Sequence, residues 1–400
     1  MKIYEIGTGY TPIPAQVPAA TESIVEELTK AYLEMGTPVE VLDISTDKRA
    51  PHSLPITQVK VPSIFTKSDV SLGIVHKLKR VVYSVALALK LKKILKKADE
   101  KIALHFHNQY NMFFFLKLVP ARLREKAVLA YTNHNGYWSL PWEQAREILN
   151  KRYFQEIESM KKADISFVLN PKMRNNAVEH LGLPKEKVVQ INNGVNTDIY
   201  RPLSQEKKDE LKGTLGLTGK KVILQVGSVN ENKGQGRSVE LLANLLKENA
   251  DLVYAFAGGI VSAEYFEQVK ATAKELGVEN QVVYLGMAAP VEEMNYIYNI
   301  ADSTLFVSKY ESFGLVCIES LSAGVPVFLC GDGLIDFGKG CILCDTEIFE
   351  NKVSILLNMG ERYEELSKIS RENAVENYTW QKIASDYERA MKQISILGEK

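Results

Sequence analysis

Two carboxylates, Glu311 and Glu319, stand with seven residues between them in the segment 308–319. An apolar run at 304–307 predicts a buried strand that leads into this segment, followed by a helix that ends near Gly324. Two carboxylates placed in this way can accept hydrogen bonds from two sets of hydroxyls on one extended ligand. The alternative is that neither residue binds a ligand: Glu311 would be an ordinary loop residue, and Glu319 would lie in the first turn of the helix, where the helix dipole favours a negative charge. Spacing alone leaves both interpretations open.

The residues between the glutamates and a second turn both offer groups that bind phosphate. Phe313, Gly314 and Leu315 are expected at the start of the helix, where N–H groups lack an intrahelical acceptor and can face an anion. After a predicted strand at 221–227, Lys233 lies at the start of another helix, where an ammonium group can neutralise a diphosphate. A Lys-Gly turn is usually only a turn, so the second signal is weak by itself.

Histidines follow two strands predicted in the first half of the chain. His105 and His107 share one face of the strand at 102–107, and His134 comes just after the strand at 127–132. A histidine at a strand end is most often a structural hydrogen-bonding group, so that interpretation stays open for each of them.

The elements that position these residues alternate between short apolar runs and helical patterns. Such alternation is typical of βαβ units and a parallel sheet. Strands are predicted at residues 2–6, 39–42, 102–107, 127–132, 165–169, 221–227, 252–257, 282–285, 304–307 and 325–329. Helices are predicted at 21–35, with a capping box at 23–26, and from about residue 380 to 393.

A chain of 400 residues is too long for one compact core and suits two domains. We predict a first domain at 1–200, a second at 201–379, and a helix at 380–400 that packs back on the first domain. A polar stretch rich in lysine and glutamate after residue 203 marks the link. Two doubly wound units in succession imply a cleft between them, with ligands beyond the carboxyl ends of the strands.

Composition argues against several classes of protein. Lysine plus arginine and aspartate plus glutamate both number 49, so the basic excess of a nucleic-acid binder is missing. Cys341 and Cys344 form a C-x-x-C pair, but the apolar stretch 341–344 predicts a buried strand with core thiols rather than a zinc site. No secretory signal or run of transmembrane length is visible, so we expect a cytoplasmic protein.

A basic stretch at 76–97 allows two interpretations. Apolar residues are interleaved there with Lys77, Lys79, Arg80, Lys90, Lys92, Lys93, Lys96 and Lys97. An amphipathic helix of this kind can lie on the inner face of an anionic membrane, which would suit a lipid-linked acceptor. The alternative is a surface helix whose apolar stripe packs on the sheet while its lysines are solvated.

Four segments in the same order resemble motifs of glycosyltransferase family 4, a retaining family with the GT-B architecture. The segment from Glu311 to Glu319 resembles its E-x7-E signature, and 323–327 is similar to its A-x-G-x-P-V run. Residues 193–197 resemble its N-G-V-D segment, and 377–380 its terminal F-S-W helix. The resemblance covers nearly the whole chain. It implies an α/β protein with two Rossmann-like domains that face a central cleft.

The resemblance implies a hexosyltransferase-type enzyme that moves a sugar from a nucleotide-diphosphate donor, with UDP as the default, to an unidentified glycan, lipid-linked sugar or small molecule. Glu311 would hold hydroxyls of the donor sugar, and Glu319 those of the ribose. The backbone of Phe313, Gly314 and Leu315 would contact the sugar and the diphosphate. Lys233 matches a phosphate-binding lysine of the family.

The chain departs from the family pattern in two loops. Ser228 stands where the family has an arginine, and a hydroxyl is a weaker phosphate partner; the nearby Arg237 is a candidate replacement. Ala19 and Ala20 stand where paired glycines are usual, which leaves Gly7 and Gly9 to allow close approach of a ligand. The family also places a histidine near the transferred sugar, which favours His134 over His107.

A retaining hydrolase has two carboxylates that flank the reacting bond, and we see no second carboxylate here to name as a nucleophile. The resemblance to the family implies a reaction on one face of the sugar, with the leaving phosphate assisting the incoming hydroxyl. No Asp-x-Asp motif stands near the site, and we predict neither a required metal nor another cofactor. Two other functions stay open: a nucleotide-sugar epimerase on the same fold, and a non-catalytic nucleotide-sugar-binding protein, for which Ser228 and the Ala19-Ala20 pair are the support.

Overall fold

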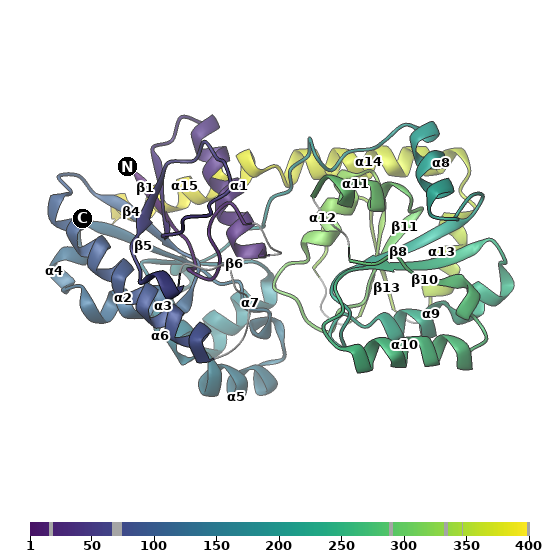
Figure 1. Cartoon of the computed structure of the whole chain (residues 1–400), viewed down its shortest axis with the longest axis horizontal. Helices are drawn as coiled ribbons and strands as arrows, with labels where there is room; N and C mark the ends of the chain where they lie inside the picture. Colours follow the sequence, from purple (N-terminus) through teal and green to yellow (C-terminus); the bar gives the residue numbers. More distant parts are fainter. Residues whose placement is uncertain (16–18, 66–73, 288–290, 332–334, 346, 398–400) are drawn as a thin grey trace. The chain divides into compact units, whose positions relative to one another are not determined.

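The structure is a computed structural model that describes residues 1–15, 19–65, 74–287, 291–331, 335–345 and 347–397. The chain divides into two compact units, one of Met1–Asn193 with Trp380–Lys400 and the other of Gly194–Thr379. Each unit has a parallel sheet with helices on its faces (Figure 1). The prediction of an α/β fold with two doubly wound sheets is therefore confirmed.

The first unit contains a seven-stranded sheet in the order β3-β2-β1-β4-β5-β6-β7. Its strands are β1 (Ile3–Ile6), β2 (Val39–Ile44), β3 (Ile56–Val59), β4 (Ile102–Phe106), β5 (Ala127–Thr132), β6 (Ile165–Val168) and β7 (Val188–Gln190). The two strands absent from our prediction, β3 and β7, are the edges. They are short and only partly buried, so they lack the continuous apolar run that identifies a central parallel strand.

The helices of the first unit are α1 (Ala20–Glu34), α2 (Ile74–Lys97), α3 (Gln109–Leu118), α4 (Ala121–Arg124), α5 (Trp142–Arg152), α6 (Phe154–Lys162), α7 (Pro171–Asn175) and α15 (Trp380–Leu397). The predicted capping box is wrong, because α1 begins before Ser23 and its N-cap, Ala19, makes no side-chain hydrogen bond. Helix α15 packs on α1, where Tyr387 and Leu28 share one buried cluster.

Helix α2 directs an apolar stripe into the first unit. Leu87, Leu91 and Leu95 are fully buried. Lys79 is also buried, and its Nζ donates a hydrogen bond of 2.7 Å to the carbonyl of Tyr10. Other lysines of the basic stretch remain exposed, namely Lys77, Lys93, Lys96 and Lys97. Among the described residues, no helix combines the length and the apolar character that a membrane span requires.

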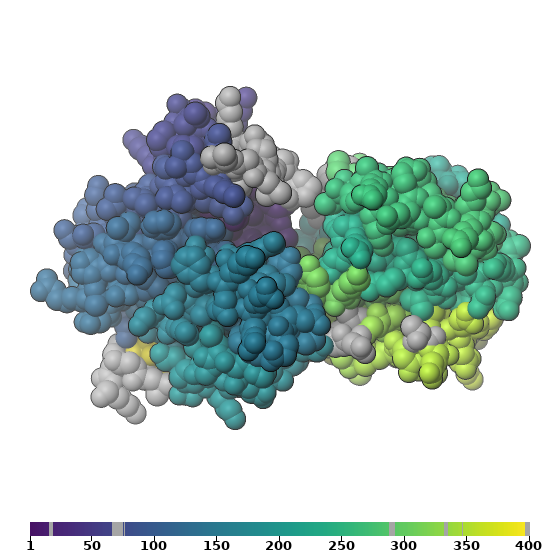
Figure 2. Space-filling model, turned by 90° about the horizontal axis from the view of Figure 1, so that it is seen from below, coloured from purple at the N-terminus to yellow at the C-terminus, as the bar shows by residue number. Residues whose placement is uncertain are grey.

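The second unit contains a six-stranded sheet in the order β10-β9-β8-β11-β12-β13. Its strands are β8 (Lys221–Val226), β9 (Leu252–Ala257), β10 (Val282–Tyr284), β11 (Ser303–Phe306), β12 (Val327–Cys330) and β13 (Cys341–Cys344). Its helices are α8 (Gln205–Thr214), α9 (Gln235–Glu248), α10 (Ala263–Glu275), α11 (Val291–Asn299), α12 (Leu315–Ser322), α13 (Phe349–Leu357) and α14 (Glu361–Asn377). Helices α9 and α10 contribute to the green surface of this unit in Figure 2.

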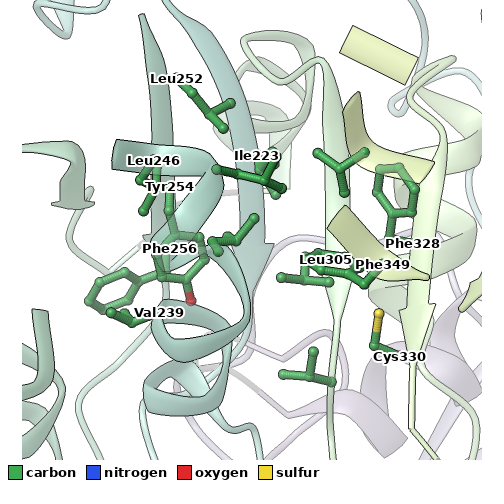
Figure 3. Close-up of a cluster of buried hydrophobic side chains, with 14 of the residues drawn as sticks. Ile223, Val239, Leu246, Leu252, Tyr254, Phe256, Leu305, Phe328, Cys330 and Phe349 are labelled. Carbon is green, nitrogen blue, oxygen red and sulfur yellow. The ribbon is translucent and has the colours of Figure 1, made fainter. Parts of the chain in front are cut away.

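The core of the second unit forms between its sheet and the helices on one face. Figure 3 shows side chains of neighbouring strands, such as Ile223 and Leu305, in one cluster with Val239 of α9 and Phe349 of α13. These strands read as near-continuous apolar runs, as expected for parallel strands covered on both faces. The core therefore holds β8 and β11 side by side at the centre of the sheet.

The cysteines of the second unit behave only partly as predicted. The stretch 341–344 is a strand, but Cys344 is buried while Cys341 is only half-buried, so the expectation of a fully buried strand is wrong. Strand β13 is an edge of the sheet, so a neighbouring strand covers it on one side only. The close thiol pair is Cys330 and Cys344, whose sulfurs lie 3.3 Å apart on neighbouring strands.

Candidate functional site

The central strands of the second unit mark a topological switch point. Strand β8 leads through α9 to β9 on one side of the sheet, and β11 leads through α12 to β12 on the other side. The loops after β8 and β11 therefore diverge at the carboxyl edge, which is where doubly wound sheets bind ligands. The two loops are joined, because Lys309 N donates to the Asn232 carbonyl at 2.9 Å and Asn232 Nδ2 donates to the Tyr310 carbonyl at 3.2 Å.

An ion pair between Lys233 and Glu311 connects the same two loops. The Nζ atom of Lys233 contacts Oε1 of Glu311, and both side chains are about four-fifths buried, with 21% and 18% exposure. Lys233 is itself held by its backbone, since its N–H donates to Asn230 Oδ1 at 3.1 Å and its carbonyl accepts from Gln225 Nε2 at 2.8 Å. An ammonium group has three donors, so the pair leaves donors for an anionic ligand.

Glu319 lies in the second turn of α12 rather than the first, because the helix begins at Leu315. The alternative of a first-turn glutamate placed for the helix dipole is therefore wrong. The hydroxyl of Tyr298 donates to Oε2 of Glu319 at 2.6 Å. Burial raises the pKa of Glu319, and hydrogen bonds from Tyr298 and Tyr200 oppose this shift. The side chain is thus oriented by its neighbours and kept partly from water.

Glycines with a left-handed backbone begin both helices of this site. Gly314 precedes α12 with φ 101°, Gly234 precedes α9 with φ 77°, and neither helix has a side-chain cap. A Cβ at Gly314 would lie 3.1 Å from the ring of Phe306, so the position also lacks room. The Phe313 side chain is buried against Phe337, with ring centroids 5.2 Å apart. The phenylalanine therefore anchors the turn, and its backbone remains the part suited to a ligand.

Two predicted donor-binding residues are engaged within the second unit. The Ser228 hydroxyl oxygen accepts from Asn230 Nδ2 at 2.9 Å. Arg237 Nη2 donates to the carbonyls of Val307 at 2.5 Å and Asn232 at 3.3 Å. The guanidinium group therefore joins the start of α9 to the end of β11. A pocket of about 530 Å³ lies beside it, lined also by Leu241 and other residues that our site prediction did not include.

His134 belongs to the first unit and lies at the carboxyl edge of its sheet. Its Nε2 is 3.0 Å from Nδ1 of His107, and Nε2 of His107 is 2.7 Å from Oε2 of Glu5. His105 lies on the other side of the same carboxylate, with Nδ1 2.8 Å from Oε1. Glu5 was not among the predicted site residues, although a charged residue within the buried strand Ile3–Ile6 was a signal.

Burial and charge set the protonation of this group. Burial by itself would raise the pKa of Glu5, but the interactions with His105 and His107 outweigh it and lower the pKa to about 2. Burial and the neighbouring His105 lower the pKa of His107 to about 4 against the opposing effect of Glu5. Burial, with smaller effects of His107 and His105, also holds the pKa of His134 well below its usual range.

Gly9 has a structural role in addition to the close approach of a ligand that was predicted for it. Its φ is 80°, and a Cβ there would collide with the ring of Tyr83 on α2. Tyr83 is fully buried, and its hydroxyl donates to the carbonyl of Gly7 at 3.0 Å. The glycine therefore lets the loop after β1 pack directly on α2.

We expect Gly9→Ala to destabilise the protein by about 2–5 kcal/mol, because a left-handed alanine and an overpacked contact both cost free energy. Gly36→Ala is the matched control, since Gly36 has φ 72° and nothing within 4 Å of a Cβ. It should cost only the backbone penalty of about 1–2 kcal/mol. The midpoints of urea unfolding compare the two variants. Equal losses would show that the Tyr83 contact relaxes.

Two protein-family models match different parts of the chain. The model of "Glycosyltransferase Family 4" matches residues 21–199, and that of "Glycosyl transferases group 1" matches residues 207–335. Spore coat protein SA of Bacillus subtilis is 26% identical over 222 residues, 50% of this chain and 58% of that protein. D-inositol 3-phosphate glycosyltransferase of Corynebacterium aurimucosum is 30% identical over 204 residues, 50% of this chain and 47% of that protein. The chain thus spans about half the length of the curated relatives it matches.

Solved structures resemble the chain over nearly its whole length. The crystal structure of Anabaena HepE in complex with UDP and glucose has a TM-score of 0.70 and 17% identity, and the match covers 98% of this chain and 99% of that one. At 17% identity, this similarity shows that the two chains share a fold and nothing more.

Proposed function

Because the chain belongs to the glycosyltransferases of family 4 and has the GT-B fold, we propose that it moves a sugar from a nucleotide-diphosphate donor to an acceptor hydroxyl. The proposal assigns the donor to the second unit, and His134 of the first unit remains a predicted catalytic residue. A UDP-sugar is the favoured donor.

The observation that carries the proposal is the pairing of Lys233 with Glu311 at the switch point between β8 and β11. A cation beside a helix start suits a diphosphate, and a carboxylate held next to it suits sugar hydroxyls. Glu319, in the second turn of α12, would accept hydrogen bonds from the ribose. The amides of Gly314 and Leu315 would contact the diphosphate. These groups together match the three parts of a nucleotide sugar.

The proposed mechanism retains the configuration at the anomeric carbon. Glu311 is paired with Lys233 and serves as an acceptor for sugar hydroxyls, so we do not assign it as a nucleophile. The leaving diphosphate would take the proton of the incoming hydroxyl on the same face of the sugar. Catalysis then consists of positioning and of stabilising the charge on the diphosphate. Independence from a divalent metal stays a prediction.

The nature of the acceptor stays open within this proposal. The name of the Corynebacterium relative indicates a small phosphorylated acceptor for that protein. A lipid-linked acceptor would agree with the exposed lysines at the end of α2, Lys93, Lys96 and Lys97, which can face anionic lipid. Membrane contact through residues 76–97 and a cytoplasmic location remain predictions.

We expect UDP to raise the melting temperature of the purified protein more than GDP or ADP does, because a ligand that binds the folded state stabilises it. Scanning calorimetry with each nucleotide measures the effect. Lys233→Met should reduce the shift, and Lys309→Met, which removes the exposed partner of Glu231, is the matched control. If none of the three nucleotides shifts the melting temperature, the transferase proposal loses its support.

The two alternatives give different products with a donor that binds. An epimerase converts the nucleotide sugar without an acceptor, so a new sugar isomer in a reaction with donor alone would favour it. A binding protein would stabilise on addition of the donor and give no turnover across a panel of glycan, lipid-linked and small-molecule acceptors. A transferase releases the free nucleotide diphosphate together with a glycosylated acceptor.

A further inference from the structure

A continuous line of hydrogen bonds crosses the first unit from β5 through β4 and β1 to the loop after β5. Thr132 Oγ1 lies 2.7 Å from Nε2 of His105, and Nδ1 of His105 lies 2.8 Å from Glu5. The other carboxylate oxygen of Glu5 lies 2.7 Å from His107, which lies 3.0 Å from His134. Glu5 and His105 are also direct partners in the register of β1 and β4.

Glu5 determines the direction of these hydrogen bonds. It is fully buried, and an ionised carboxylate accepts hydrogen bonds but cannot donate them. The low pKa of about 2 agrees with an ionised carboxylate. Both neighbours must therefore donate to it, His105 through Nδ1–H and His107 through Nε2–H.

The direction of the hydrogen bond between His107 and His134 follows from the tautomer of His107. A neutral imidazole carries one N–H, so a His107 that donates from Nε2 has an unprotonated Nδ1. That atom can only accept, and the atom that faces it is Nε2 of His134. His134 must then carry its proton on Nε2. Among the described residues, Nδ1 of His134 makes no hydrogen bond, which leaves it as the nitrogen open to a ligand.

We propose that Glu5 and His107 are positioning residues that hold His134 as the Nε2–H tautomer, so that its unprotonated Nδ1 accepts a hydrogen bond from a hydroxyl of a bound substrate. The identity of that ligand rests on the proposed function. The direction of the hydrogen bonds rests only on the contacts of the three side chains and Glu5.

A metal ion is the competing use of the same side chains, since ligand atoms of Glu5, His105 and His107 all lie within 4.8 Å of one another. Both histidines, however, already lie at ordinary hydrogen-bond distance from the carboxylate, at 2.7 and 2.8 Å. Hydrogen bonds therefore satisfy these ligand atoms directly. Stoichiometric metal found in the purified protein by elemental analysis would overturn the proposal.

The first test is the tautomer of each histidine, read from the nitrogen shifts of protein labelled with ¹⁵N-histidine at about pH 8, above the ordinary imidazole pKa. The chain has six histidines, so single substitutions assign the signals. We expect Nδ1–H at His105 and Nε2–H at His107 and His134. A protonated Nδ1 at His134 would overturn the proposal.

The substitution Glu5→Gln tests whether Glu5 sets the tautomers of the histidines. A glutamine amide has one acceptor atom and one donor group, so it cannot accept from both histidines. In this variant, either His105 or His107 must shift its proton to the other ring nitrogen. If His107 shifts its proton to Nδ1, His134 must also change its tautomer, because its Nε2 then has to accept a hydrogen bond. The control is Glu40→Gln on the adjacent strand β2, which removes the charge beside Lys2 and should leave all three tautomers unchanged. Retention of both tautomers in Glu5→Gln, or a change at His107 alone, would contradict the proposal.

The second test asks which nitrogen of His134 faces the ligand. The side-chain amide of asparagine reaches the position of Nδ1, and that of glutamine reaches the position of Nε2. We expect His134→Asn to keep about tenfold more kcat/KM than His134→Gln, the value of one hydrogen bond to the ligand. The reverse order would overturn the proposal for His134. Absence of any transfer by the wild type would count against the proposed function, while the tautomers would still decide the role of Glu5.

Discussion

Replacing Lys233 by methionine is expected to lower kcat for sugar transfer by about 100- to 1000-fold, the usual effect of removing one preorganised group that stabilises developing charge. Lys233 lies at the start of α9, is mostly buried, and is the cation that contacts Glu311. Its ammonium group would stabilise the diphosphate as the bond to the sugar breaks. The measurement is the release of nucleotide diphosphate at saturating donor and acceptor.

The control for this result is Lys309→Met. Lys309 pairs with Glu231 at 3.1 Å in the same two loops, but the pair is exposed, and removing an exposed pair has little effect. Lys233→Arg keeps the charge with a different geometry and should fall between the wild type and Lys233→Met. A loss of kcat of less than tenfold in Lys233→Met would show that another group, such as Arg237, neutralises the negative charge of the diphosphate.

Glu319→Gln is expected to weaken nucleotide binding by about 10- to 100-fold, because hydrogen bonds to a charged acceptor contribute about 1.5–3 kcal/mol. The same substitution should raise the melting temperature of the free protein at neutral pH. Burial raises the pKa of Glu319, so the ionised form costs stability in the folded state. That cost grows as pH rises from the unfolded-state pKa through the folded-state pKa. Calorimetric titration and thermal unfolding measure the two effects.

Opposite signs of the two effects would separate a binding role from a structural one. Glu275→Gln on α10 is the matched control, since it removes the same charge from an exposed helix position of the same unit. Neither nucleotide affinity nor melting temperature should change in that variant. If Glu319→Gln lowered both affinity and stability, the hydrogen bond from Tyr298 would be the main role of this carboxylate.

The central part of the fold was accessible from the sequence because buried parallel strands have a local signature. The runs at β1, β4, β5, β8, β9 and β11 are mostly apolar, and each was predicted close to its observed bounds. The edge strands β3 and β7 lack that signature, since they owe their conformation to pairing with one neighbour. Likewise, the start of α1 at Ala20 did not follow from its side chains, because no capping group marks it.

The candidate site divides in a similar way. Glu311, Glu319, Lys233 and the turn at Gly314 were predicted from residue types and spacing together with the resemblance to glycosyltransferase family 4, since spacing alone left their role open. That Lys233 and Glu311 touch was not predictable, since they are 78 residues apart in the chain. Glu5 was missed because its meaning depends on His105, which lies 100 residues away.

The sequence by itself determined the alternation of strands and helices, the two doubly wound sheets, and the residue types available at each strand end, since these depend on local patterns of burial and backbone conformation. Only the tertiary structure decided which side chains meet. The register of β1 against β4 pairs Glu5 with His105, and the pairing of β8 with β11 joins Lys233 to Glu311. The direction of a hydrogen bond and the shift of a pKa follow from such contacts, because both depend on the distance and charge of neighbours that the chain brings together only when it folds.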